Sequence, residues 1–190
     1  VVLAGLGAGG VAALYNWLLG IAHQGMTENF RMNRLLMWIQ PENYSSGIGY
    51  QTVQGLYAIG SGGLFGKGLG KSLQKLGFIP ESQNDMIFSI ICEELGLFGA
   101  MCIILVFALM LWRIIHIAQN APDLFGTMLA AGVFAHVAVQ VVLNIAVVTN
   151  FIPNTGVSLP FISYGGTASF FLLLEMGIVL NISSKIRLER

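Results

Sequence analysis

Charged residues are scarce in this chain of 190 residues. Lys and Arg together number 9 and Asp and Glu also number 9, so charged residues make up 9% of the sequence and the formal net charge is zero. Soluble proteins carry roughly 25% charged residues, so this chain cannot cover a water-facing surface in the ordinary way. The absence of a basic excess also excludes a typical nucleic-acid partner, which requires a stripe of positive charge.

Cysteine is also rare, which argues against both a disulfide framework and a metal centre. Cys92 and Cys102 lie on one predicted helix, too far apart to bridge. No Cys and His residues have the spacing of a metal site. The chain begins at Val1 without an initiator Met or the basic start of a signal peptide. We therefore expect it to be the C-terminal part of a larger protein.

Hydrophobic residues dominate instead, at 55% of the sequence, with a mean hydropathy of +0.76. We therefore expect an all-α, polytopic membrane protein, with residues 1–190 forming a single transmembrane domain. A bilayer crossing takes about 20 apolar residues, which gives about four spans. The expected spans are Val1–Ala22, Met86–Trp112, Phe125–Val148 and Thr167–Ile182.

Between the first two spans lies the region 23–85, which is too polar to cross a membrane. Long loops in compact domains are usually functional. Within it, Arg31–Ile39 is predicted to form a short amphipathic helix at the membrane interface, anchored by Trp38 and ended by Pro41. Gln51–Ile59 could form another helical turn or two. Because long loops count little in the positive-inside rule, we place this loop on the extracytoplasmic side.

A glycine-rich segment, Gly60–Ser72, lies near the end of this loop and does not fit the Walker A pattern. Its backbone N–H groups, with Lys67 and Lys71 beside them, could hold an anionic group. A purely conformational role is an equally strong interpretation.

Asp85 lies where the polar loop meets the second span, within reach of water and of a lipid-linked substrate. From the residues alone, capping of the helix that begins near Asn84 is the stronger interpretation, because acids are favoured at helix N-termini. Glu81 could orient Asp85 or cap the same helix. Glu93 and Glu94 fall inside the span, so they should face a bundle interior or a wet cavity. Buried, hydrogen-bonded carboxylates are an equal alternative for both.

The third span carries a polar stripe. His136, Gln140 and Asn144 have the i, i+4, i+8 spacing of one helical face, which should point into the bundle. For His136 an interhelical hydrogen bond is favoured over catalysis. A loop punctuated by Pro and Gly then leads to the fourth span, which contains Glu175.

A set of motifs lies in order along the chain. They are Arg31-x-x-Arg34, Pro41-Glu42, Gly49-Tyr50-Gln51-x-x-Gln54, Ala58–Gly66, Pro80-Glu81 with Asp85-x-Ile87-Phe88, Glu93–Gly96, Asn144, and Pro153-x-Thr155-Gly156-x-x-Leu159-Pro160-Phe161-x-Ser163-Tyr164-Gly165-Gly166. Together they resemble the SEDS family (shape, elongation, division and sporulation) of FtsW, RodA and SpoVE. Gly68–Lys75 is closer to the FtsW/SpoVE branch. Gln83 departs from the family, where many members have His, so the resemblance does not support a His-assisted proton relay here.

The resemblance implies a membrane enzyme of roughly ten helices, at about 20 residues per span. Such an enzyme polymerises lipid II into peptidoglycan with a class B penicillin-binding protein, in cell division, septal wall or spore cortex synthesis. The family's essential aspartate maps onto Asp85. We expect Asp85 to act as a general base on the acceptor sugar hydroxyl, with lipid pyrophosphate as the leaving group.

The departing pyrophosphate needs positive charge or hydrogen-bond donors to stabilise it. The predicted substrate-binding residues are Arg31, Arg34, Lys67, Glu81, Gln51 and Ser163. For the two arginines, anchoring to membrane lipid headgroups is the alternative. A divalent cation could share the task, although no carboxylate cluster identifies a site for one and no other cofactor is expected.

Two other functions remain open from the sequence. A lipid II flippase could use the polar stripe and the intramembrane carboxylates as a path, since transporters place ionisable groups near the midplane. A scaffold that only recruits a penicillin-binding protein is the third possibility. The loop 23–85 is the most polar part of the chain, which favours an enzyme acting at the membrane surface over a flippase.

Overall fold

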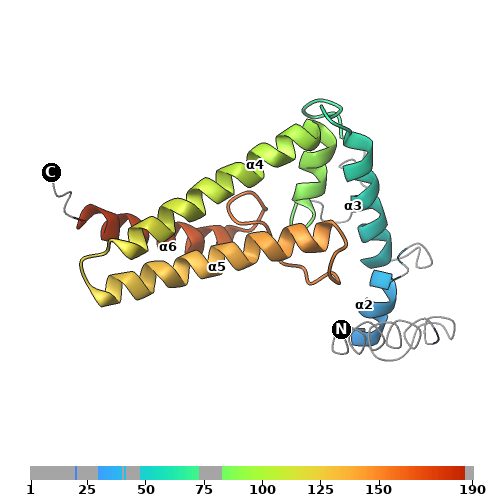
Figure 1. The fold of residues 1–190 in the computed structure, drawn as a ribbon. Coiled ribbons are helices and arrows are strands. Elements are labelled where there is room, and N and C mark those ends of the chain that lie inside the picture. Colours follow the sequence, from blue (N-terminus) through green and yellow to red (C-terminus); the bar gives the residue numbers. More distant parts are fainter. Residues whose placement is uncertain (1–19, 21–29, 40, 42–47, 73–82, 187–190) are drawn as a thin grey trace, which may run out of the picture.

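The structure is a computed structural model that describes residues 20, 30–39, 41, 48–72 and 83–186, apart from the side chains of residues 30–32 and 48 (Figure 1). Every regular element in these ranges is a helix, which confirms the all-α class. The helices are α2 (Phe30–Ile39), α3 (Ile48–Gly62), α4 (Ile87–Gln119), α5 (Leu124–Val148) and α6 (Gly166–Ser184). The expected first span, Val1–Ala22, lies outside the described residues except for Gly20.

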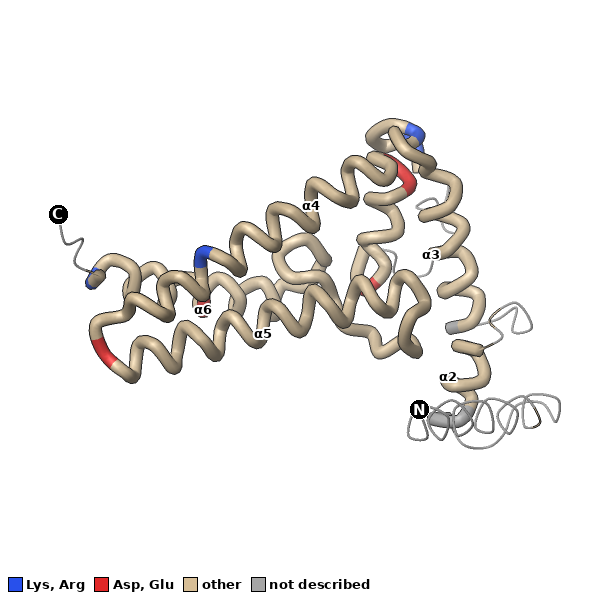
Figure 2. Tube along the Cα trace, in the orientation of Figure 1, with Lys and Arg blue, Asp and Glu red and all other residues tan. Residues whose placement is uncertain are grey.

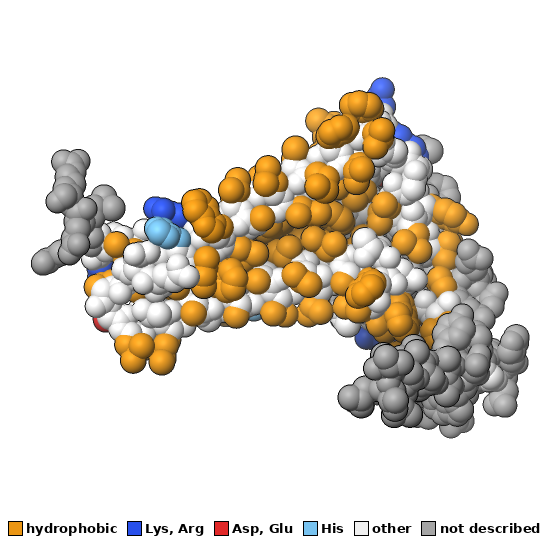
Figure 3. Space-filling view, in the orientation of Figure 1, with side chains coloured by type: hydrophobic (Ala, Val, Ile, Leu, Met, Phe, Trp, Pro, Cys, Tyr) orange, Lys and Arg blue, Asp and Glu red, His pale blue; other side chains and the backbone are white. Residues whose placement is uncertain are grey.

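Three of these helices, α4, α5 and α6, are long and apolar enough to cross a membrane. Their most apolar windows have mean hydropathies of 2.6, 2.1 and 1.5, and few charged positions interrupt them (Figure 2). Hydrophobic side chains cover much of the outer face of α4 and α5 (Figure 3). The second, third and fourth expected spans are thereby confirmed as helices.

The core lies where α4 packs against its neighbours. Side chains such as Ile114 of α4, Val137 of α5 and Val179 of α6 are almost completely buried. Near the start of α4, Met86 packs into the same cluster as Ala58 of α3. α4 therefore joins the α3 region to the spanning helices.

α2 has nearly the extent that the sequence predicts, whereas α3 is longer than the expected turn or two. It has 15 residues and continues to Gly62. α3 extends this far because its glycine-containing end packs closely against α4, a contact between segments far apart in sequence.

The expected single span starting at Met86 is wrong in one respect, because α4 is broken at Gly96. This residue has φ 68° and ψ −167°, a backbone conformation that only glycine adopts readily. A short segment (87–95) runs beside α3, and the chain then bends sharply into the long segment (97–119) that packs along α5 (Figure 1). The break therefore places the start of α4 away from the axis of the long segment.

Residues 63–72, here called the glycine-rich turn, close this break with backbone hydrogen bonds. A helix break leaves N–H and C=O groups without their usual partners, and burying them unpaired would be costly. The bonds that satisfy them are Lys67 N to Glu93 O (2.9 Å), Gly68 N to Glu94 O (3.0 Å), Leu97 N to Gly63 O (2.9 Å) and Phe98 N to Leu64 O (3.2 Å). These bonds support the conformational interpretation of the glycine-rich segment, and they occupy N–H groups that an anion would need.

The closeness of α3 to α4 makes a matched pair of glycine substitutions informative. A Cβ at Gly62 would overlap the backbone carbonyl of Cys92, whereas a Cβ at Gly60 would meet nothing within 4 Å. We expect Gly62→Ala to cost about 1–3 kcal/mol through steric strain. Gly60→Ala, in the same helix, should be neutral or stabilising by up to about 1 kcal/mol. Thermal unfolding of the two variants checks this, and equal melting temperatures would contradict the contact.

The polar stripe of α5 is partly as expected. Asn144 is fully buried, and His136 Nδ1 lies 2.9 Å from Glu175 Oε2 of α6, which confirms the interhelical hydrogen bond. The His136 side chain is 46% exposed within this chain, so the expectation that the whole stripe points into the bundle stays a prediction.

Candidate active site at the start of α4

Asp85 lies in the turn 83–86 that leads into α4, and its carboxylate is partly buried. Gln51 of α3 donates a hydrogen bond from Nε2 to Asp85 Oδ1 over 3.1 Å. The structure thus brings two of the predicted site residues together, 34 positions apart in sequence. Because Gln51 of α3 holds one carboxylate oxygen, the orientation of the carboxylate is set by a tertiary hydrogen bond as well as by the conformation of the turn.

The backbone of this turn is held from α5 and from the loop before α6. The buried amide of Asn144 donates to the carbonyl oxygens of Asp85 (2.8 Å) and Val157 (2.7 Å). Tyr164 N donates to Gln83 O over 2.8 Å. From sequence, Asn144 is identifiable as a polar residue facing the bundle and as one of the family-like positions, but its partners cannot be named. It is the residue that ties the candidate base to the spanning helices.

The capping alternative for Asp85 can be compared with the backbone at this point. The N-cap position of α4 is occupied by Met86, which provides no side-chain cap. Asp85 lies one residue earlier, and its carboxylate contacts α3. An acid here still benefits from the helix dipole, but it does not occupy the cap position.

α2 is hydrogen-bonded to the loop 149–165, which precedes α6. Trp38 Nε1 donates to Asn150 O over 3.0 Å, and Asn150 Nδ2 donates to Trp38 O over 3.4 Å. Arg34 Nη1 donates to Asn154 O over 3.4 Å. The loop 149–165 therefore contacts α2 at one end and the Asp85 turn at the other, and Arg34 is linked to that turn through the loop.

Ser163, another predicted substrate-binding residue, has a structural partner. Its hydroxyl accepts a hydrogen bond from Leu159 N (2.7 Å), and its own N–H donates to Leu159 O (3.0 Å). The side chain is buried. These bonds close the turn before α6, and a role for this hydroxyl toward substrate stays a prediction.

Lys67 lies in a different place from Asp85. Its Nζ is 2.7 Å from Glu93 Oε1, and Glu93 is completely buried. Ser61 Oγ (3.4 Å) and Ser72 Oγ also donate to this carboxylate. Glu93 lies six residues after Ile87, the first residue of α4, which is about 9 Å of helical rise beyond the Asp85 turn. Glu93 is thus confirmed as a buried, hydrogen-bonded carboxylate, and Lys67 is its counter-ion.

A cavity of about 320 Å³ lies along the short segment of α4. The residues that line it are Leu69, Gln83, Ile87, Ile90, Ile91, Glu94 and Leu95. Glu94 Oε1 is buried and has no hydrogen-bond partner within the described part of the chain. Gln83 belongs to the Asp85 turn, so the cavity reaches this turn, although Asp85 itself does not line it.

Two predicted residues cannot be placed, and one predicted ligand has no visible site. Glu81 and the side chain of Arg31 lie outside the described residues, so both stay predictions. Among the residues that the structure describes, no group of three or more His, Cys, Asp or Glu side chains could hold a metal ion. A role for a divalent cation therefore also stays a prediction.

Comparison with solved structures shows the same fold in two proteins. A chain from a peptidoglycan synthase complex, described as coordinating polymerization and crosslinking, aligns over 95% of this chain and 49% of its own, with a TM-score of 0.66 and 24% identity. A Thermus thermophilus rod shape-determining protein RodA, solved as an Asp-to-Ala mutant, aligns over 92% of this chain and 65% of its own, with a TM-score of 0.54 and 22% identity.

Sequence relatives are closer. Stage V sporulation protein E of Bacillus subtilis is 46% identical over 166 residues, which cover 87% of this chain and 45% of that protein. A probable peptidoglycan glycosyltransferase FtsW of Trichlorobacter lovleyi is 44% identical over 84% of this chain and 42% of its own length. The probable peptidoglycan glycosyltransferase FtsW of Bacillus subtilis is 44% identical over 80% of this chain and 38% of its own length. The chain therefore spans less than half the length of these curated relatives.

A family model described as a cell cycle protein, covering FtsW, RodA and SpoVE, matches residues 2–188. This match covers nearly the whole chain, and the three sequence relatives named above come from the FtsW and SpoVE branch. The chain belongs to the FtsW/RodA/SpoVE family.

Proposed function

We propose that this chain carries the catalytic carboxylate of a peptidoglycan glycosyltransferase that polymerises lipid II. The observation that carries the proposal is the Asp85 carboxylate, oriented by Gln51 and held through its backbone by Asn144 at the start of an apolar helix. The names of the FtsW relatives, which describe them as probable peptidoglycan glycosyltransferases, support the reaction class. SpoVE and FtsW relatives support a role in sporulation or division.

In the proposed reaction, a sugar hydroxyl of one lipid II attacks the anomeric carbon of another. Asp85 takes the proton of that hydroxyl as the new C–O bond forms. The bond to the lipid pyrophosphate breaks, its electron pair leaves with the pyrophosphate, and a single displacement inverts the anomeric centre. General-base assistance of this kind contributes about 10²–10⁴-fold, and the hydrogen bond from Gln51 keeps the carboxylate in one orientation.

The charge that develops on the pyrophosphate must also be stabilised. We assign this to Arg34 and Arg31 ahead of Lys67, because guanidinium groups can bind phosphate oxygens bidentately. Arg34 is hydrogen-bonded to the loop that also contacts the Asp85 turn, whereas Lys67 already neutralises Glu93. Glu81 and Ser163 remain candidates for contacts to the sugar-peptide part of the substrate.

The cavity that reaches the Asp85 turn suggests where the lipid part of a substrate could lie. Its walls are mainly Leu and Ile side chains, with Gln83 and Glu94 as the polar lining residues. Burial of an isoprenoid chain against such walls is favourable at about 25 cal/mol per Å². We assign the cavity to the polyprenyl segment next to the pyrophosphate.

The spanning helices and the family make this a multi-pass protein of the plasma membrane. We place the loop 23–85 and Asp85 on the extracytoplasmic face, and we propose a class B penicillin-binding protein as the partner. The solved complex that shares the fold is described as joining polymerization to crosslinking, which supports a partner of this kind.

Lipid II transport is the competing function, and one experiment separates the two. The full-length protein, purified with its penicillin-binding protein, is given fluorescent lipid II in detergent and, separately, in vesicles. We expect glycan chains on a gel. Translocation of lipid II across the vesicle membrane without any polymer would contradict the transferase and favour the flippase. The flippase is less well supported, because Glu93, one of its candidate intramembrane carboxylates, is already paired with Lys67.

A further inference from the structure

The glycine-rich turn, residues 63–72, exposes large apolar side chains. Leu64, Phe65 and Leu69 are 58%, 79% and 77% exposed. The backbone of the turn lies so close to α4 that a Cβ at Gly66 would overlap the carbonyl oxygen of Glu94, so no side chain fits between the two. Hydrophobic side chains gather at this tip of the molecule, with Lys side chains beside them (Figure 3). An exposed apolar patch of this kind marks a contact surface.

Phe65 joins this patch to the spanning part of α4. Its ring stacks on the ring of Phe98, with the two centroids 5.3 Å apart. From there, one face of α4 carries exposed apolar side chains at helical spacing, namely Phe98, Met101, Leu105, Leu109 and Trp112. The patch therefore continues an apolar stripe that belongs to a helix able to cross a membrane.

The stripe alone is too short to cross a bilayer. The rise from Phe98 to Trp112 is about 21 Å at 1.5 Å per residue, whereas the hydrocarbon core of a bilayer is about 30 Å thick. A tilt of the helix shortens its projection further. About 9 Å of apolar surface is therefore needed beyond one end of the stripe.

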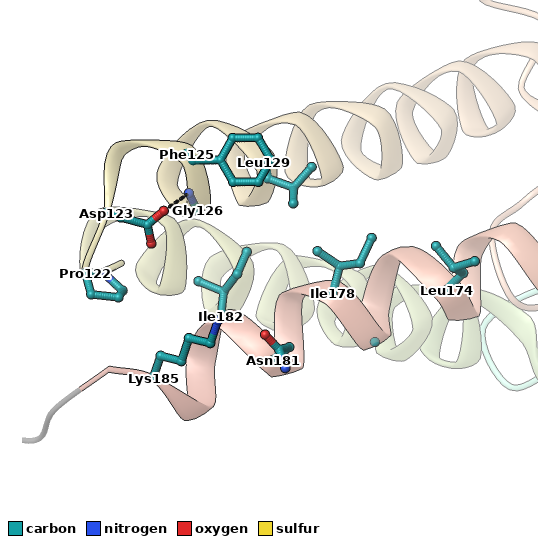
Figure 4. A pocket seen from close by; sticks show the side chains of 11 residues that line it. Pro122, Asp123, Phe125, Gly126, Leu129, Leu174, Ile178, Asn181, Ile182 and Lys185 are labelled. Carbon is teal, nitrogen blue, oxygen red and sulfur yellow. Dashed lines mark hydrogen bonds between the residues drawn. The ribbon is translucent and has the colours of Figure 1, made fainter.

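That surface does not lie beyond Trp112. Every exposed residue of α4 after this position is polar, namely Arg113, His116 and Gln119. The neighbouring helices also meet polar residues at this end. Asp123 caps α5 by accepting from Gly126 N over 3.1 Å, and Lys185 follows α6. Both line a cavity of about 480 Å³ between these helices (Figure 4). The apolar surface therefore continues only at the glycine-rich turn.

The charge of the turn also fits a lipid surface. Lys67 is paired with Glu93, whereas Lys71 is exposed and has no ion-pair partner among the residues that the structure describes. A lysine beside inserted apolar side chains reaches the phosphate level of a bilayer, because its stem is apolar and its ammonium group is at the tip. Each basic residue near an anionic membrane surface adds to the attraction.

We propose that the glycine-rich turn anchors the protein in the bilayer on the side of α3. Leu64, Phe65 and Leu69 insert among the acyl chains, and Lys71 contacts lipid phosphate groups. The turn thereby supplies the apolar surface that α4 lacks beyond Phe98. Because the same turn closes the α4 break through backbone hydrogen bonds, the lipid contact also sets the depth of the short segment 87–95 in the bilayer.

Quenching by brominated lipids tests the insertion. An environment-sensitive fluorescent amino acid replaces the exposed Phe65 in the full-length protein, purified with its penicillin-binding protein. The complex is reconstituted in phosphatidylcholine vesicles with and without bromine on the acyl chains. We expect blue-shifted emission that brominated lipid quenches, and the same result with the probe at Leu69. Blue-shifted emission without quenching would place a protein surface on the turn, and the emission of a probe in water would place the turn outside the bilayer. Either result would overturn the proposal.

Anionic lipid tests the contact of Lys71. Phosphatidylglycerol in the vesicles should increase the quenching of the probe at position 65, because it adds negative charge at the phosphate level. Lys71→Gln should abolish this increase. Arg113→Gln, at an exposed position near the other end of α4, is the control and should leave the increase unchanged. An increase that survives Lys71→Gln, or that Arg113→Gln removes equally, would overturn the assignment of the phosphate contact to Lys71.

Discussion

Asp85→Asn is expected to lower the rate of glycan polymerisation by about 10²–10⁴-fold, the usual contribution of a general base. Asparagine has nearly the same size and can still present an oxygen to Gln51, but it cannot take the proton of the attacking hydroxyl. The turn should keep its place, because Asn144 and Tyr164 hold it through backbone carbonyls that the substitution leaves unchanged. The measurement is steady-state turnover of lipid II by the full-length protein with its partner.

Gln51→Leu is the matched control for this substitution. It removes the hydrogen bond to Asp85 Oδ1 but leaves the carboxylate itself, so the loss of turnover should be far smaller than at Asp85. A neutral hydrogen bond is worth about 0.5–1.5 kcal/mol, and one to a charged group about 1.5–3 kcal/mol. Similar losses in both variants would indicate that Asp85 contributes orientation and not proton transfer.

Lys67→Met is expected to destabilise the fold by about 1–3 kcal/mol, the cost of leaving a buried carboxylate without its partner; the loss is smaller than for a fully buried pair because the Lys67 side chain is 33% exposed. Glu93 is completely buried, whereas the Lys67 side chain that lies 2.7 Å from it is not, so water replaces only part of the lost contact. The two serine hydroxyls that also donate to Glu93 are neutral, so they cannot compensate its charge. Because the pair lies where the glycine-rich turn closes the α4 break, the loss should appear in the free energy of unfolding of the full-length protein.

Lys71→Met provides the matched control, since Lys71 is an exposed lysine of the same glycine-rich turn. Its replacement should change stability by no more than about 0.5 kcal/mol, as is usual for surface sites. The double variant Lys67→Met/Glu93→Gln should recover part of the loss, because it removes the unpaired charge. Equal effects of Lys67→Met and Lys71→Met would contradict a structural role for the ion pair.

The spanning helices could be predicted from sequence because hydropathy is a local signal. α5 and α6 begin and end within two residues of the apolar runs that define them. The break in α4 could not be predicted, since Gly96 lies within a segment that has the length and the hydropathy of a single span. Its left-handed conformation depends on hydrogen bonds from the glycine-rich turn, which is about 30 residues earlier in the chain.

The candidate site could be predicted only in part, because its contacts also join residues that are far apart in the sequence. Asp85 could be singled out by its place at the start of a span and by the family resemblance. Its contacts could not, because Gln51 and Asn144 lie 34 and 59 positions away. Lys67 shows the opposite error: a lysine in a glycine-rich segment suggests an anion site, but the anion that it meets is Glu93, 26 positions later.

The role of Asp85 is tested most directly by lipid II binding and polymerisation measured on one preparation of full-length Asp85→Asn with its partner. A general base is needed for the chemical step and not for binding. We predict that lipid II binds within about threefold of wild type, a difference below 1.4 kcal/mol, while glycan chains are almost absent. Polymerisation within about tenfold of wild type, below the usual contribution of a general base, would contradict the role of Asp85 as the catalytic base.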